Sequence, residues 1–91
     1  MRTSELLQPI VQEILDRLDR KDEELGGQYW TDPEEEPIKF FVQNMERKKF
    51  IIDRVSNREG IERGRPILDD STIDYIGYSL LFEWRLRNKG R

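Results

Sequence analysis

Acidic side chains gather near the ends of two segments that read as helices. Asp19 lies three and four residues before Asp22 and Glu23, and Asp70 lies four residues before Asp74. Residues at these spacings are neighbours on a helix surface. Carboxylate oxygens are ligands for Mg²⁺, which keeps waters and substrate phosphates in its shell. If the two helix ends meet, the acids on them form a magnesium site. Its candidate ligands are Asp22, Glu23, Asp70 and Asp74.

The same acids have a structural interpretation that the sequence leaves open. Ser71 and Asp74 match a capping box, in which the Asp74 carboxylate accepts a hydrogen bond from the Ser71 amide. Acids interspersed with lysines and arginines also form solvated helix faces. Asp74 is therefore either a metal ligand or a helix cap.

Basic residues gather on the middle segment and just after it. Residues 46–65 hold seven lysines and arginines against four acids, and the bases of the segment are expected on its polar face. Arginine guanidinium groups bind phosphate oxygens in pairs. The pattern predicts phosphate binding by Arg47, Lys48 and Arg54, with ordinary pairing to nearby acids as the alternative.

Two aromatic residues follow a glycine pair. Gly26 and Gly27 can end a helix, because glycine accepts the left-handed conformation at that point. Tyr29 and Trp30 follow after Gln28. Aromatic rings can stack on a nucleotide base, so the pattern predicts base stacking by Tyr29 and Trp30. The alternative is that these rings fold back onto a small core.

The residue inventory excludes several classes of site. The chain has no cysteine and no histidine, so disulfides, zinc-cysteine sites and a Ser-His-Asp triad are excluded. No apolar run approaches the roughly 20 residues of a membrane span. The first five residues include an acid where a signal peptide would be apolar, which predicts a cytoplasmic protein without membrane contact. A net charge of −3 argues against duplex nucleic acid as a partner.

Hydrophobic periodicity predicts an all-α protein of three helices. Apolar residues recur at three- and four-residue intervals over about residues 4–25, 37–55 and 71–89. Glycine and proline punctuate the segments between them, including a loop over 56–70. No stretch alternates apolar and polar residues as a strand would.

The size and composition predict one small domain over residues 1–91 that needs a partner. A chain of 11.0 kDa buries only about 60–70% of the surface it exposes when unfolded. Apolar residues cover more than half of the middle helix, and aromatic residues flank the last one. Two partner helices cannot cover that surface, so we predict a three-helix bundle completed by homo-oligomerisation.

Three segments together resemble a known family. Residues 70–81 (DSTIDYIGYSLL) resemble the last core helix of small MazG-like proteins. Residues 20–30 (RKDEELGGQYW) are similar to a lysine-then-aromatic segment of the phage and nucleotide-modification branch of that family, and residues 44–49 (NMERKK) fit its middle helix. The likeness spans roughly residues 20–83.

The resemblance implies an all-α, oligomeric pyrophosphohydrolase that cleaves nucleoside triphosphates with carboxylate-held magnesium. By position, it implies that Asp74 is a metal ligand, that Asp70 is a second one, and that Arg47 contacts phosphate. Asp22 and Glu23 stand where the first helix contributes acids.

The expected function is therefore nucleotide binding, with magnesium-dependent pyrophosphate release as its catalytic form. The acids of the first helix match the family's motif only loosely, and the sequence assigns no catalytic residue. The alternative function is a non-catalytic, phage-type helical oligomer that sequesters a nucleotide or binds and inhibits a partner protein.

Overall fold

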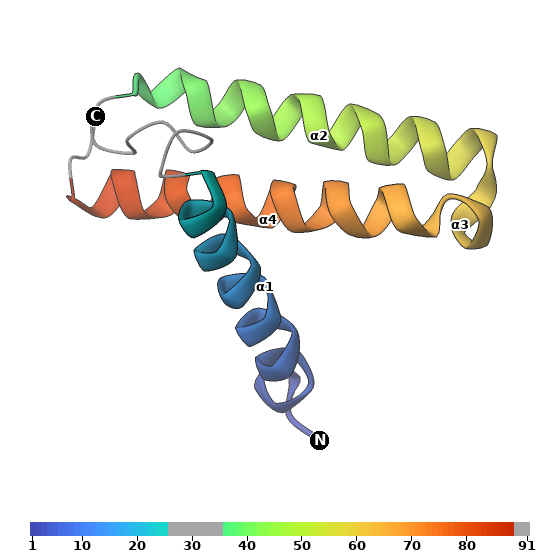
Figure 1. The fold of residues 1–91 in the computed structure, drawn as a ribbon, viewed down its shortest axis with the longest axis horizontal. Coiled ribbons are helices and arrows are strands. Elements are labelled where there is room, and N and C mark those ends of the chain that lie inside the picture. Colours follow the sequence, from blue (N-terminus) through green and yellow to red (C-terminus); the bar gives the residue numbers. More distant parts are fainter. Residues whose placement is uncertain (26–35, 89–91) are drawn as a thin grey trace. The chain divides into compact units, whose positions relative to one another are not determined.

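The computed structural model describes residues 1–25 and 36–88, apart from the side chains of residues 22 and 25, and every element in these ranges is a helix (Figure 1). The helices are α1 (Thr3–Leu25), α2 (Ile38–Arg58), α3 (Gly60–Arg63) and α4 (Arg65–Asn88). The predicted all-α class is confirmed. The chain divides into two compact units, Met1–Glu35 and Glu36–Arg91. The single domain over 1–91 and its completion by oligomerisation stay predictions.

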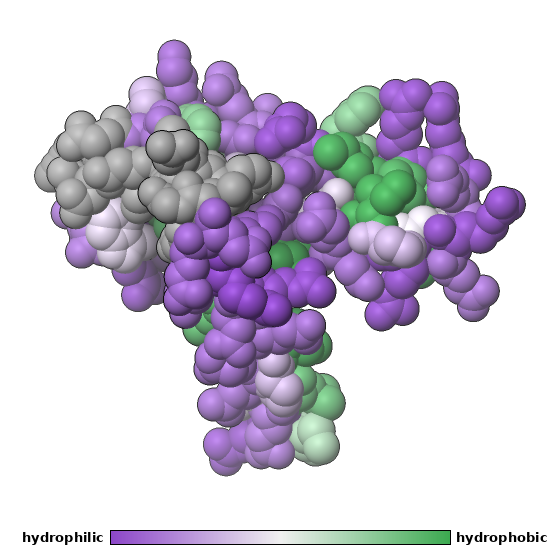
Figure 2. Space-filling view, in the orientation of Figure 1, coloured by the Kyte–Doolittle hydropathy of each residue, from purple (hydrophilic) through white to green (hydrophobic). Residues whose placement is uncertain are grey.

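The first unit contains α1, whose sequence is amphipathic. The helix begins at Thr3, where the amides of Glu5 and Leu6 donate to the main-chain oxygen of Arg2, and it continues through Pro9. Apolar side chains of its first four turns are exposed, and hydrophobic surface is visible along this part of α1 (Figure 2). They are Leu6, Leu7, Ile10, Val11 and Leu15.

The second unit is a hairpin in which α2 and α4 run antiparallel and side by side (Figure 1). Three aromatic rings pack together in it, those of Phe40, Phe41 and Tyr78. The Phe40 ring is edge-on to the Phe41 ring at a centre-to-centre distance of 5.6 Å and to the Tyr78 ring at 6.2 Å. Edge-to-face packing suits the charge distribution of aromatic rings. Phe41 is almost fully buried and Tyr78 is buried, so these rings fix one end of the hairpin.

The turn of the hairpin differs from the prediction. Most of the expected loop over residues 56–70 is helical, because α2 continues to Arg58 and α4 already begins at Arg65. Pro66 falls in the first turn of α4, where the missing amide costs no hydrogen bond. Gly60 has a φ of 81°, a conformation that other residues rarely adopt, and it reverses the chain between α2 and α3.

The early start of α4 also overturns the capping interpretation of Asp74. Ser71 and Asp74 lie inside the helix, beyond its first turn, and both are buried. A capping box requires the serine to precede the first helical turn. Asp74 is therefore a residue of the helix interior that faces the inside of the hairpin.

Gly64 provides a test of this turn. A Cβ at position 64 would overlap the Val55 Cγ1 methyl and would lie 3.1 Å from the Gly60 carbonyl oxygen. We expect Gly64→Ala to lower the free energy of unfolding by about 1–3 kcal/mol, because the added methyl forces the close-packed turn apart. Urea denaturation followed by circular dichroism measures the change. Glu62→Ala, at an exposed position of α3, is the control, and equal loss in both variants would contradict the packing.

Candidate functional site

A buried ion pair joins the two long helices of the hairpin. The Lys48 Nζ atom of α2 lies 2.9 Å from the Asp74 Oδ2 atom of α4. Lys48 is 8% exposed and Asp74 is 2% exposed, and the neighbouring Ser71 is buried as well. These three are the buried polar side chains of the second unit's described residues, whereas its buried Phe41, Leu68 and Tyr78 are large and hydrophobic.

Helical periodicity explains why Lys48 points inward. It lies seven residues after Phe41 and seven before Val55, so all three occupy the same stripe of α2. The prediction that Lys48 belongs to the polar face of the middle helix is therefore wrong. The spacing from Phe41 was the signal in the sequence that could have placed it correctly.

Asp74 is placed inward by the same rule on α4. It lies three residues after Ser71 and four before Tyr78, and all three are buried. Burying a carboxylate is costly unless a cation and hydrogen bonds compensate for the lost water. The Lys48 ammonium lies 2.9 Å from the carboxylate and provides positive charge for it.

This pair is better evidence for a role than for stability. A buried ion pair is often no more stabilising than apolar residues of the same volume. Charged groups held in a low-dielectric surrounding are also typical of functional sites, although structural ion pairs share this feature. The Lys48–Asp74 pair is therefore the leading candidate for a functional centre in the second unit.

The structure separates the three predicted phosphate-binding residues. Arg47 is exposed and donates from Nη2 to the Asn44 Oδ1 atom at 2.9 Å, while Arg54 is exposed and lies 6.0 Å from the centre of the Phe50 ring. Lys48 instead faces α4. Arg47, Lys48 and Arg54 therefore do not form one phosphate clamp within the second unit.

The structure also shows how the predicted carboxylate ligands are placed. Asp70 and Glu23 are exposed, whereas Asp74 is buried beside Lys48. Among the described residues, no group of three or more Asp, Glu, His or Cys side chains could hold a metal ion. One carboxylate does not by itself make a magnesium site, because Mg²⁺ takes several oxygen ligands. The Asp22 side chain, Tyr29 and Trp30 lie outside the described residues.

A second polar contact in the hairpin had no signal in the sequence. The Arg85 Nη1 atom donates to the main-chain oxygen of Glu36. Glu36 stands two residues before the start of α2, and Arg85 lies in the last turns of α4. This bond therefore ties the open end of the hairpin together, opposite the turn at Gly60 and Gly64.

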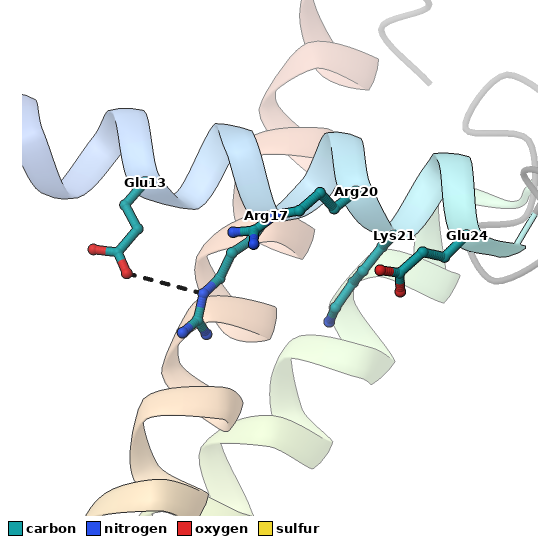
Figure 3. A pocket seen from close by; sticks show the side chains of 5 residues that line it. All are labelled: Glu13, Arg17, Arg20, Lys21 and Glu24. Carbon is teal, nitrogen blue, oxygen red and sulfur yellow. Dashed lines mark ion pairs between the residues drawn. The ribbon is translucent and has the colours of Figure 1, made fainter.

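The first unit has a charged surface hollow on α1. It has a volume of about 460 Å³, and its lining side chains project from one side of the helix (Figure 3). They are Glu13, Arg17, Arg20, Lys21 and Glu24. The Arg17 Nε atom lies 4.0 Å from the Glu13 Oε1 atom, and the Arg20 Nε atom donates weakly to the main-chain oxygen of Asp16 at 3.4 Å. Because carboxylates flank the cations, the hollow is close to neutral.

Comparisons with known proteins add no assignment. A scan against protein-family models found no match, and searches of curated proteins and of solved structures found none either. No helix in the described ranges is long and apolar enough to cross a membrane. The geometry of the chain itself is therefore the basis for a function.

The contribution of the ion pair to stability can be measured directly. We expect Lys48→Met to lower the free energy of unfolding by about 3 kcal/mol, because the buried Asp74 carboxylate loses its contact with the Lys48 ammonium. The double variant Lys48→Met/Asp74→Leu should recover much of that loss, since it replaces both charges with apolar side chains. Urea denaturation of the two variants and the parent gives the values.

Lys49→Met is the matched control for this experiment. Lys49 is the exposed neighbour of Lys48 on the same helix, so its replacement should change stability by less than about 0.5 kcal/mol. A Lys48→Met variant as stable as Lys49→Met would show that the pair contributes nothing in solution.

Proposed function

We propose that this chain is a nucleotide-binding helical protein of MazG-like type. The observation that carries the proposal is the Lys48–Asp74 pair, whose atoms lie 2.9 Å apart inside the hairpin. Asp74 belongs to the segment 70–81, which resembles the last core helix of that family. A buried acid that faces a cation from the middle helix is the arrangement that the proposal needs.

Lys48 is the proposed contact for a phosphate group. An ammonium carries three hydrogen-bond donors, so it can bind the Asp74 carboxylate and a phosphate oxygen together. In this proposal Asp74 positions the ammonium, and its burial keeps competing water away. Attraction between Lys48 and a phosphate is stronger in such a surrounding than at an exposed lysine.

Pyrophosphate release with magnesium is the catalytic form of the proposal. It requires carboxylates in addition to Asp74, and the ones that the sequence predicts for this role are Asp70, Asp22 and Glu23. Charge on a polyphosphate that is being cleaved can be neutralised by positioned cations and metal ions, so the absence of histidine from the sequence is no obstacle.

The alternative proposal is a non-catalytic helical oligomer that sequesters a nucleotide or binds a partner protein. The exposed apolar residues favour it. Leu7, Ile10 and Val11 are exposed on α1, and Leu80 and Trp84 are exposed on α4. Exposed apolar side chains at three- and four-residue spacing on one helix, as on α1, are typical of protein–protein interfaces. A second copy of the chain is the proposed occupant.

Nucleotide binding is tested on Asp74. We expect the parent to bind at least one nucleoside triphosphate in calorimetry, with pyrophosphate released on addition of magnesium if the catalytic form holds. Asp74→Asn should weaken binding tenfold or more, because the Lys48 ammonium loses the carboxylate that positions it.

The control is Asp69→Asn, which removes a carboxylate from the same helix. Asp69 is exposed and pairs with Arg65 at 3.0 Å, so its loss should leave binding unchanged. Circular dichroism verifies that both variants are folded. Absence of binding across the nucleotides, or equal binding by the parent and Asp74→Asn, would refute the proposal.

Homo-oligomerisation is tested on α1. We expect sedimentation at micromolar concentration to give a mass above one chain, and Ile10→Asp to lower it, because burying an unpaired carboxylate in an apolar contact is costly. Gln12→Asp introduces the same charge two residues away, on another face of the helix, and should have no effect. A parent that sediments as a single chain would be decisive against the oligomer.

A further inference from the structure

The outer face of α2 carries an exposed aromatic ring that the hairpin does not use. Phe50 is 61% exposed, although it lies in the middle of the helix. It is two residues from the buried Lys48, and side chains two apart on a helix point in nearly opposite directions. Phe50 therefore points away from α4 and from the Lys48–Asp74 pair.

Arginines accompany this ring along the helix. Arg47, Arg54 and Arg58 are exposed and lie within about 40° of one another around the axis, as follows from 100° per residue. They span about 16 Å along it, at 1.5 Å per residue. The Arg54 guanidinium lies 6.0 Å from the centre of the Phe50 ring, within the range of a cation–π contact.

The ring and two of these arginines border a hollow in the surface. It has a volume of about 460 Å³ and is lined by Phe50, Asp53, Arg54, Asn57 and Arg58. All five come from consecutive turns of α2, so the hollow does not depend on any other part of the chain. Three of its polar side chains are of the kinds that contact phosphates and base edges, with Arg54 and Arg58 as donors to phosphate and Asn57 as donor and acceptor. The fourth, Asp53, is an acid that repels phosphate.

We propose that this outer face of α2 binds single-stranded nucleic acid, with a base stacked on Phe50 and the backbone phosphates on Arg47, Arg54 and Arg58. Stacking on an exposed ring beside a row of cations is how proteins bind single strands with little sequence preference. The hollow is formed by one face of one helix, whereas small-molecule sites enclose most of their ligand. An extended strand fits this open row better than a mononucleotide does.

Acids on the other edge of the ring determine on which side of Phe50 the backbone of the strand lies. Glu46 and Asp53 lie on the side of Phe50 opposite the arginines. Phosphates are repelled from that edge and attracted to the arginine edge, so the backbone follows the arginines. A duplex has charged backbones on both sides of its groove and stacked bases that cannot reach Phe50, so the surface selects single strands.

The proposal does not rest on nucleotide binding at Lys48. Its test is fluorescence anisotropy of the full chain with a labelled oligothymidylate of about 12 nucleotides, within the usual site size. We expect binding that weakens with salt, with a log–log slope of about −2 for three phosphate contacts. Phe50→Ala should weaken binding about tenfold, and Arg54→Gln should make the slope shallower by about 0.7.

Two matched variants separate this surface from a general effect. Ile61→Ala removes an exposed apolar side chain of 66% exposure, and Arg63→Gln removes an exposed arginine, both on α3. Each should bind the oligonucleotide like the parent. Circular dichroism and sedimentation of all four variants check that folding and mass are those of the parent.

The proposal is overturned by any of the following results. One is no anisotropy change up to about 100 μM protein, the weak limit of non-specific binding. Another is an equal loss of oligonucleotide affinity in the Phe50 and Ile61 variants. The others are displacement of the labelled oligonucleotide by thymidine monophosphate at the concentration at which the unlabelled oligonucleotide competes, and binding of a duplex as tightly as the single strand. A lower sedimentation mass for Phe50→Ala would instead assign the ring to a contact between chains, and would also overturn it.

Discussion

One buried interaction in the second unit constrains how its two long helices can align, the ion pair between Lys48 and Asp74. Two charges that have left water are tolerated only while they stay together, because each alone carries a large desolvation cost. A slide of α4 along α2 by one helical turn would move them about 5.4 Å apart. The pair therefore fixes the register of the hairpin more strictly than the surrounding apolar side chains, which can exchange partners at smaller cost.

The two ends of the hairpin bring this pair together. At one end, Gly60 reverses the chain and Gly64 lets α3 approach Val55 closely, so α4 can begin at Arg65 and run back along α2. At the other end, Arg85 donates to the main-chain oxygen of Glu36. Between these ends, the buried Phe41 and Tyr78 side chains lie seven residues before Lys48 and four residues after Asp74 on the two helices. The tight turn and the polar bond thus position charges that neither of them touches.

The two faces of α2 suit different interactions. Its inner face holds the Lys48 ammonium against Asp74, in a surrounding that strengthens charge interactions. Its outer face presents Phe50 and exposed arginines to solvent, where a ring can stack on a ligand and salt screens the charge of the arginines. The helical repeat alone separates these faces, since Lys48 and Phe50 are only two residues apart. Basic residues that look like one cluster in the sequence therefore belong to two surfaces.

The sequence by itself determined the helical class and the approximate bounds of α1 and α2, because apolar periodicity and glycine stops are local signals. It failed at residues 56–70, where glycine and proline are compatible both with a loop and with a tight helical turn, and only packing against Val55 decides between them. It also assigned Lys48 to the polar face and left Asp74 open between a cap and a ligand. Only the tertiary structure showed that the two side chains meet, because the partner of a buried charge is chosen by the register of two helices, and that register is not encoded in the periodicity of either one.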